Sequence, residues 1–195
     1  MKKAKRFFDL VPALILWLML SVFLWGWIFT FLTDAKPENK LSLFVDASVT
    51  DGAGLAVRLE EELLDDTIRM VKVHPFTYAM LDSEPLRQAD VYLVRASHVE
   101  EYRDWFAPLP EHFADAMRVG EDSLFVLDDT VYGIRIWNAQ EGTGIAKSYI
   151  DYHDPALPDE DYYLFFGRES LHLTGNENGL DDKAVQLAET LLFIH

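Results

Sequence analysis

The chain has 195 residues, of which 33 are acidic and 17 are basic, and its formal net charge at pH 7 is −16. Such an excess of negative charge repels the phosphates of nucleic acid, so the composition argues against a nucleic-acid partner. The absence of cysteine excludes disulfides, thiolate metal ligands and thiol nucleophiles.

Residues 10–32 form a run of apolar side chains without a formal charge, and four basic residues precede it. A helix of this length crosses a hydrocarbon core of about 30 Å. Because basic flanks stay on the cytoplasmic side of a membrane, we expect residues 1–9 to be cytoplasmic. The pattern predicts a single-pass protein of the cell membrane, with lipid around one transmembrane helix and residues 33–195 outside the cytoplasm.

A cleaved signal peptide is the alternative interpretation of this segment, since it also begins with basic residues. Signal peptides usually have a shorter apolar region of about 7–15 residues and end in a small-x-small cleavage site. The apolar run is longer here, and residues 31–40 contain no convincing site of that kind. We therefore favour a retained anchor, followed by a short polar linker at residues 33–40.

The first half of residues 41–195 alternates between strand and helix patterns. We expect strands at 41–47, 68–73 and 91–94, a loop at 48–54, and a helix at 55–64 that ends at Asp65 and Asp66. Ser97 and Glu100 have the spacing of a capping box, which predicts a helix that reaches Trp105. This order of elements favours parallel strands joined by right-handed crossovers.

The second half is predicted to complete the same domain. The expected elements are a short helix at 111–117, a hairpin of strands at 123–127 and 130–137, a short helix carrying Ile145, Tyr149 and Ile150, a loop at 151–161, a central strand at 162–166, and a final helix capped by Asp181. The predicted fold class is therefore α/β, with a mixed, mainly parallel sheet flanked by helices in one domain at residues 41–195.

Three short segments carry a family resemblance. Residues 89–94 (ADVYLV), 106–110 (FAPLP) and 131–134 (VYGI) resemble the first lobe of type 2 extracellular solute-binding proteins. Arg135 stands where that family usually has proline. The resemblance implies a periplasmic-binding-protein-like lobe that binds a solute without chemistry and is linked to a transporter. The family binds its ligand between two lobes, whereas this chain is long enough for one.

Ligands of open α/β sheets bind beyond the carboxyl ends of the strands. This rule selects as candidate ligand-binding residues Ser48, Thr50, Asp51, Gly52, Arg95, Ser97 and His98, together with Tyr132, Arg135 and Trp137. The aromatic members, with Trp105, suit stacking on a sugar. The alternative interpretations are an ordinary strand-to-helix turn for the polar loops and burial in the core for the aromatic side chains.

The sequence gives less support to a metal site, a catalytic nucleophile or a phosphate loop. The acidic loop at 151–161 lacks the spacing of a calcium loop, so we expect no metal site there. Ser170 and His172 lack the motif of a nucleophile elbow, and Gly142 with Gly144 is too little for a phosphate loop. We expect no enzyme and no cofactor, and a hydrolase that uses aspartates is a third hypothesis.

Two functions remain open from the sequence. The first is a membrane-anchored extracytoplasmic binding module for a small solute such as a sugar. The second is an accessory or structural subunit, whose domain docks on a membrane-protein partner through protein–protein interaction and binds no ligand.

Overall fold

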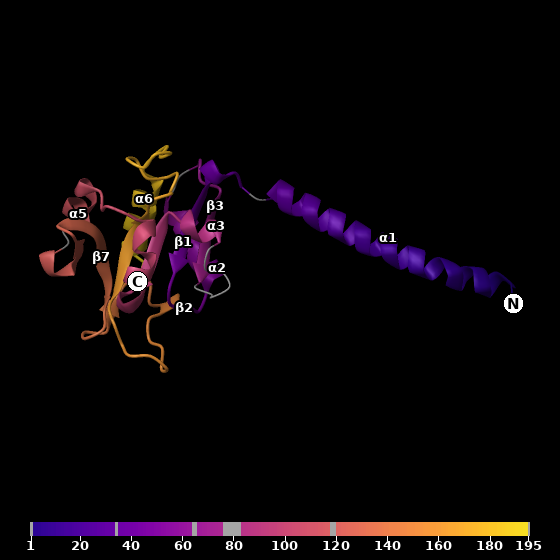
Figure 1. Cartoon of the computed structure of the whole chain (residues 1–195), viewed down its shortest axis with the longest axis horizontal. Helices are drawn as coiled ribbons and strands as arrows, with labels where there is room; N and C mark the ends of the chain where they lie inside the picture. The colour runs from indigo at the N-terminus through magenta and orange to yellow at the C-terminus, as the bar shows by residue number, and fades with distance from the viewer. Residues whose placement is uncertain (1, 34, 64–65, 76–82, 118–119, 195) are drawn as a thin grey trace. The chain divides into compact units, whose positions relative to one another are not determined.

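The computed structural model describes residues 2–33, 35–63, 66–75, 83–117 and 120–194. The chain divides into two compact units, residues 1–36 and residues 37–195. Figure 1 shows both units, and each is described by itself below.

The first unit contains one long helix, α1 (Lys2–Thr33). Its segment Val11–Phe29 is long and apolar enough to cross a membrane, since 19 residues of helix extend about 28 Å. The side chains of Trp17, Trp25 and Trp27 are each about two-thirds exposed within the unit. An apolar helix of this kind near an N-terminus is consistent with a membrane anchor or with a signal peptide.

The second unit is built on a mixed sheet, which has eight strands among the described residues. Its six longer strands are, in spatial order, β3 (Met70–Pro75), β1 (Lys40–Val45), β4 (Val91–Arg95), β10 (Tyr162–Gly167), β7 (Thr130–Asn138) and β6 (Leu124–Leu127). Two-residue strands extend it: β5 (Phe106–Ala107) pairs with β10, and β8 (Thr143–Gly144) pairs with β7. A separate ribbon joins β2 (Ser48–Val49) to β9 (Ile150–Asp151).

The expectation of a mainly parallel sheet is wrong. Only β3, β1 and β4 run parallel to one another, whereas β10 is antiparallel to both β4 and β7. The reason is that the chain returns to the middle of the sheet in β10 without a crossover helix, and that β6 and β7 form a hairpin. The prediction that residues 162–166 form a central strand is confirmed.

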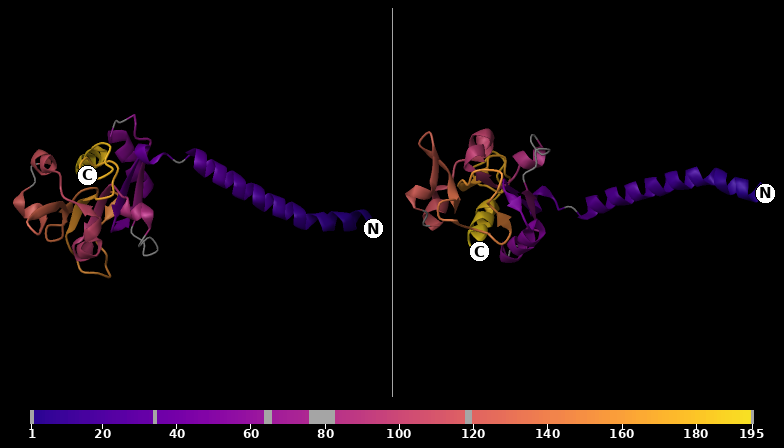
Figure 2. Two further views of the ribbon diagram at one scale, coloured as in Figure 1. Left: turned by 45° about the horizontal axis from the view of Figure 1, so that its top comes forward. Right: turned by 90° about the horizontal axis from the view of Figure 1, so that it is seen from below.

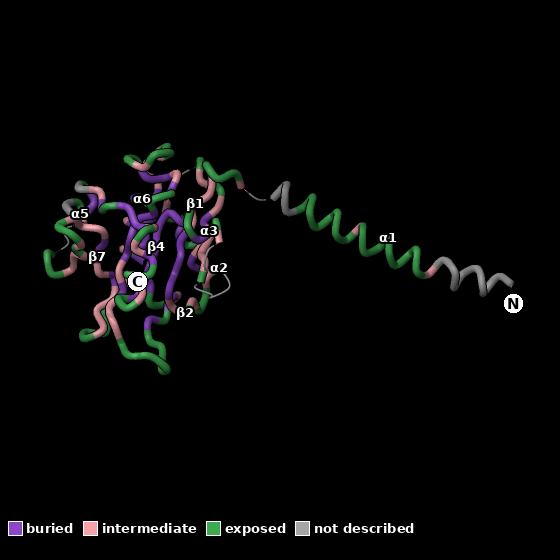
Figure 3. The backbone as a smooth tube through the Cα atoms, viewed as in Figure 1, coloured by how far each residue is buried: buried purple, intermediate pink, exposed green. Residues whose placement is uncertain are grey.

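Alternating side chains of the central strands fill two cores. On one face, Leu43 and Leu164 pack beneath the helices α2 (Gly52–Leu63) and α6 (Lys183–Leu192). Figure 3 shows the buried backbone in the middle of this unit, and Figure 2 shows α6 in yellow at the end of the chain. The predicted helices at residues 55–64 and after Asp181 are confirmed in type, although α2 begins earlier and the N-cap of α6 is Asp182 rather than the predicted Asp181. Leu64 and Asp65 lie outside the described residues.

The other face carries an aromatic core. Phe44, Tyr92 and Phe165, which alternate with the residues of the first core, pack against Tyr102 and Phe106. The rings of Phe106 and Phe165 are stacked with centroids 4.1 Å apart. The short helices α3 (Glu84–Arg87) and α4 (Val99–Tyr102) cover this face through Leu86, Val99 and Tyr102. Because both faces are covered, the central strands contain almost continuous apolar runs.

The remaining short elements are η1 (Pro37–Asn39), η3 (Ala96–His98), η4 (Arg103–Trp105), α5 (Glu111–Met117) and η5 (Glu121–Ser123). The predicted helix at 111–117 is confirmed as α5. The predicted hairpin is also confirmed, and Asp128 and Asp129 form its turn with φ values of 48° and 62°. Left-handed conformations at both positions are typical of the two-residue hairpin turn that matches the twist of the strands.

Two helix predictions are wrong. No helix carries Ile145, Tyr149 and Ile150, because this stretch forms β8, a series of turns and β9. The predicted capping box is absent, since the Ser97 side chain donates to Glu160 instead, and the helix is broken into η3, α4 and η4. In both cases contacts with distant strands or loops replace the local helical hydrogen bonds.

Candidate functional site

A cleft of about 440 Å³ lies at one edge of the sheet. The parallel strands β1 and β4 end there, and the antiparallel strand β10 begins there, with Tyr162 directly opposite Arg95. The residues that line the cleft are Asp46, Ala47, Ser48, Arg95, His98, Asp151, His153, Asp154, Pro155, Leu157 and Tyr162. Its position follows the rule that carboxyl ends of strands form the ligand sites of open α/β sheets.

Asp46 is the buried acid of the cleft. It follows the last residue of β1, and only 5% of its surface is exposed. Its Oδ2 accepts a 2.8 Å hydrogen bond from His98 Nδ1 and a longer one from the Arg95 backbone N–H. Burial raises the pKa of the Asp46 carboxyl above its ordinary value, and the contact with His98 opposes this shift. A carboxylate on Nδ1 requires that this nitrogen carries the proton.

Arg95 is the buried base of the cleft. Its Nε lies 3.1 Å from Glu160 Oε1 in an ion pair, although the angles do not form a hydrogen bond. The guanidinium carbon lies 5.6 Å from the centre of the Tyr162 ring. Burial raises the pKa of the Tyr162 hydroxyl, and the charge of Arg95 opposes this shift. Arg95 is therefore already neutralised by Glu160 and packed on an aromatic ring.

Glu160 connects the acidic loop at residues 151–161 to the segment that follows β4. Its two oxygens accept hydrogen bonds from the Ser97 backbone N–H at 2.7 Å and from the Ser97 hydroxyl at 2.9 Å. Within the loop, His153 Nδ1 lies 2.6 Å from Asp159 Oδ1, and this bond raises the pKa of the exposed His153 ring. Asp151 and Asp154, which precede these contacts in the chain, both line the cleft.

The predicted ligand-binding residues divide into two groups. Ser48 and Arg95 line the cleft, as does His98. Thr50 and Asp51 lie outside its lining: the Thr50 hydroxyl donates to the Tyr149 carbonyl, and Asp51 accepts the Gly54 N–H at the start of α2.

The five other candidates have structural contacts outside the lining. Gly52 is the first residue of α2, and Ser97 binds Glu160. Tyr132 packs on the aromatic core, and Trp137 stacks on Tyr152 with centroids 4.9 Å apart. Arg135, the last of the candidates, pairs with Asp161 at 3.2 Å.

Sequence reasoning missed Asp46 and Tyr162. Asp46 directly follows an apolar strand, a signal that pointed to the correct edge of the sheet. No sequence pattern indicated Tyr162. It is the first residue of β10, and it reaches this edge because β10 runs antiparallel to β4.

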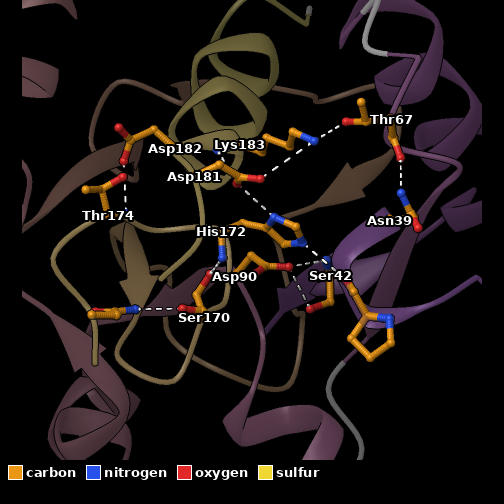
Figure 4. A network of polar contacts seen from close by, with 12 residues as sticks. Asn39, Ser42, Thr67, Asp90, Ser170, His172, Thr174, Asp181, Asp182 and Lys183 are labelled. Carbon is orange, nitrogen blue, oxygen red and sulfur yellow. Dashed lines mark hydrogen bonds and ion pairs between the residues drawn. The ribbon is translucent and has the colours of Figure 1, made fainter. Parts of the chain in front are cut away.

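A second polar cluster surrounds Asp90, the residue before β4 (Figure 4). Asp90 is 3% exposed and accepts hydrogen bonds from the Ser170 hydroxyl at 2.5 Å and from the backbone and hydroxyl of Ser42 at 2.7 and 3.1 Å. Burial raises the pKa of Asp90, and the bonds from the two serines oppose this shift. The cluster satisfies a buried acid with three donors.

His172 extends this cluster but does not activate Ser170. Its Nδ1 lies 2.9 Å from Asp181 Oδ1 and its Nε2 lies 3.2 Å from the Pro37 carbonyl oxygen, so both ring nitrogens face acceptors other than the serine (Figure 4). The Ser170 hydroxyl bonds instead to Asp90 and to the His172 backbone N–H. Because nucleophile and base must share a hydrogen bond, this arrangement is not a catalytic pair.

Within the described ranges, no group of three or more His, Asp or Glu side chains is arranged so that it could hold a metal ion.

The comparisons with known proteins include a distant similarity to a solved structure. No family model matches the chain, and no curated protein matches it. The structure of thiaminase I from Bacillus thiaminolyticus, which has a periplasmic-binding-protein-like fold, is similar with a TM-score of 0.37 and 17% sequence identity. The similarity covers 50% of this chain and 28% of that chain, so this protein spans less than a third of that length.

Proposed function

We propose that this protein is a membrane-anchored binding module that holds a small solute in the cleft formed by Asp46, Arg95 and Tyr162. The single observation that supports it best is the position of the cleft. The parallel strands β1 and β4 end at it, and the buried side chains of Asp46 and Arg95 at these ends line it. Its volume of about 440 Å³ is within the usual range of small-molecule sites, roughly 300–1,000 Å³.

The proposed location is the outer face of the cell membrane. The apolar segment Val11–Phe29 is retained as a transmembrane anchor, residues 1–9 stay in the cytoplasm, and the domain of residues 41–195 lies outside. Four basic residues before the segment support this orientation. A carbonate wash of membranes from producing cells should leave the full-length chain in the pellet, and protease added to intact cells should digest the domain. A mature chain that begins after residue 32 would identify a signal peptide instead.

Solute binding is tested on the full-length chain in detergent. A panel of sugars, amino acids, short peptides, amines and carboxylates is screened by thermal shift, and positive compounds are titrated by calorimetry. The substitution Ser48→Phe fills the mouth of the cleft and should abolish binding. Asn178→Phe, at an exposed position away from the cleft lining, is the matched control and should leave binding unchanged.

The proposed function includes no chemical step. The buried hydroxyl of Ser170 is bonded to Asp90 and not to an imidazole, which supports a binding role over a hydrolase.

A second candidate function is an accessory subunit of a membrane complex. The observation in its favour is that Leu180 and Phe193 expose 62% and 72% of their surfaces on the domain, while α1 exposes its tryptophans. Photo-crosslinking from position 193 in intact cells separates the two functions. A defined crosslinked protein, together with a thermal-shift screen without positive compounds, would favour the accessory role.

A further inference from the structure

The charges around the cleft are unbalanced. Three carboxylates line it, those of Asp46, Asp151 and Asp154, and Arg95 is the lining residue with a permanent positive charge. Glu160 already neutralises that guanidinium at 3.1 Å. The two imidazoles of the lining also face carboxylates, since His98 donates to Asp46 and His153 pairs with Asp159. The lining therefore contains more carboxyl groups than permanent positive charges.

Asp46 offers one carboxylate oxygen to the cleft. Both hydrogen bonds to its side chain end on Oδ2, and no described residue donates to Oδ1. Although 96% of the side chain is buried, Oδ1 is not among the described buried atoms that lack a hydrogen-bond partner, so this oxygen is the part of the side chain that a ligand can reach. A largely desolvated carboxylate that lines a cleft is well satisfied by a donor that carries a positive charge.

The walls of the cleft restrict the kind of cation. Leu157 and Pro155 provide apolar surface in the lining, and the volume leaves room for several carbon atoms beside a charged group. The described residues place no three ligands close enough together for a metal ion. These features suit an organic cation better than a bare metal.

We propose that the cleft recognises a small primary ammonium compound, whose charged group binds Asp46 Oδ1 in the field of Asp151 and Asp154 while its carbon chain packs on Leu157. The proposal rests on the proposed function, because it names the ligand class of the same cleft. The negative charge of the whole domain supports it, since the field around the protein draws cations toward the surface.

The test compares three compounds of one shape: n-butylammonium, n-butanol and butyrate. Each is titrated into the full-length chain in a non-ionic detergent at low salt by calorimetry, and ligand-observed NMR detects weak binding. Butylammonium should bind saturably, and its affinity should fall as salt is added. The neutral and anionic compounds should bind at least about tenfold more weakly, because neither can form the charge-assisted hydrogen bond to Asp46.

The variants link the effect to the cleft. Asp46→Asn should weaken butylammonium binding by about tenfold, and Asp122→Asn should leave it unchanged, although both remove one negative charge. Asp122 is exposed on η5 and does not line the cleft. Asp46 is buried, so its variant risks misfolding. The double substitution Asp151→Asn with Asp154→Asn removes negative charge from the cleft at two exposed positions instead. It should weaken butylammonium binding by at least threefold.

The possible failures are distinguishable. If butyrate or a sugar binds and Ser48→Phe abolishes that binding, the cleft is a solute site and the ammonium proposal is wrong. If butylammonium binds equally well to the Asp46 and Asp122 variants, it binds by general charge attraction and the proposal is again wrong. If no compound of any class binds, both this proposal and the proposed function are overturned.

Discussion

The carboxylate of Asp46 and the imidazole of His98, which are 52 residues apart in the sequence, are joined by a hydrogen bond of 2.8 Å. The bond connects the end of β1 to the turn that follows β4. It holds together two sides of the cleft and provides the main partner of an acid that is almost completely buried.

Removal of His98 should therefore destabilise the domain. In His98→Ala, Asp46 Oδ2 keeps only the weak bond from the Arg95 backbone, and we expect the free energy of unfolding to fall by about 1–3 kcal/mol. Urea unfolding of the wild type, His98→Ala, Asp46→Ala and the double variant forms a thermodynamic cycle. A coupling energy of about 0.5–3 kcal/mol is expected. Additive effects would show that the two side chains do not interact.

The buried acid Asp90 should make stability depend on pH. Its pKa in the folded protein lies above the ordinary 3.8, so the folded state holds a proton that the unfolded state has lost. The contribution of Asp90 is fully present below pH 3.8 and decreases as the pH rises through the raised pKa. The wild type should therefore lose stability relative to Asp90→Asn as the pH rises through this window.

Denaturant unfolding of both proteins at a series of pH values measures this difference, and the contributions of all other groups cancel. Above the window, the difference between the two proteins should be constant. A difference that does not vary with pH would show that Asp90 titrates alike in both states.

Gly167, at the end of β10, should not tolerate a side chain. A Cβ atom at this position would lie 1.9 Å from the Ala89 carbonyl oxygen, a backbone atom that cannot move away easily. We expect Gly167→Ala to destabilise the domain by about 1–3 kcal/mol or more through this overpacking. Gly120→Ala is the matched control, because no atom of the described residues beyond its chain neighbours lies within 4 Å of its Cβ position. Thermal unfolding followed by circular dichroism compares the two variants.

The hairpin turn should be improved by a glycine. Asp129 has a φ of 62°, a left-handed conformation that costs L-residues about 1 kcal/mol and glycine almost nothing. Asp129→Gly should therefore raise the free energy of unfolding by up to about 1 kcal/mol. Asp122→Gly, at a position without a positive φ, should not. Urea unfolding is the measurement, and a loss of stability in Asp129→Gly would show that the aspartate side chain stabilises the turn.

Several features could be predicted from the sequence because they depend on neighbouring residues. The charge-free run of residues 10–32 predicts a long apolar helix, and α1 contains it. The alternation of Leu43, Phe44 and Val45 between the two cores, the hairpin at Asp128 and Asp129, and the apolar strand at residues 162–166 all follow from local patterns. Hydrophobic burial and turn conformation are properties of short segments, so a sequence pattern determines them.

The direction of β10, and with it the cleft, was decided only by the tertiary structure. Asp46, Arg95 and Tyr162 meet because β10 runs against β4, and the acidic loop is attached to the end of β4 because Glu160 bonds to Ser97, 63 residues earlier in the chain. Either strand direction would bury Leu164 and Phe166 equally well, so the apolar pattern carries no information about it. The choice depends on backbone hydrogen bonds and ion pairs between distant segments, and these exist only after the chain has folded.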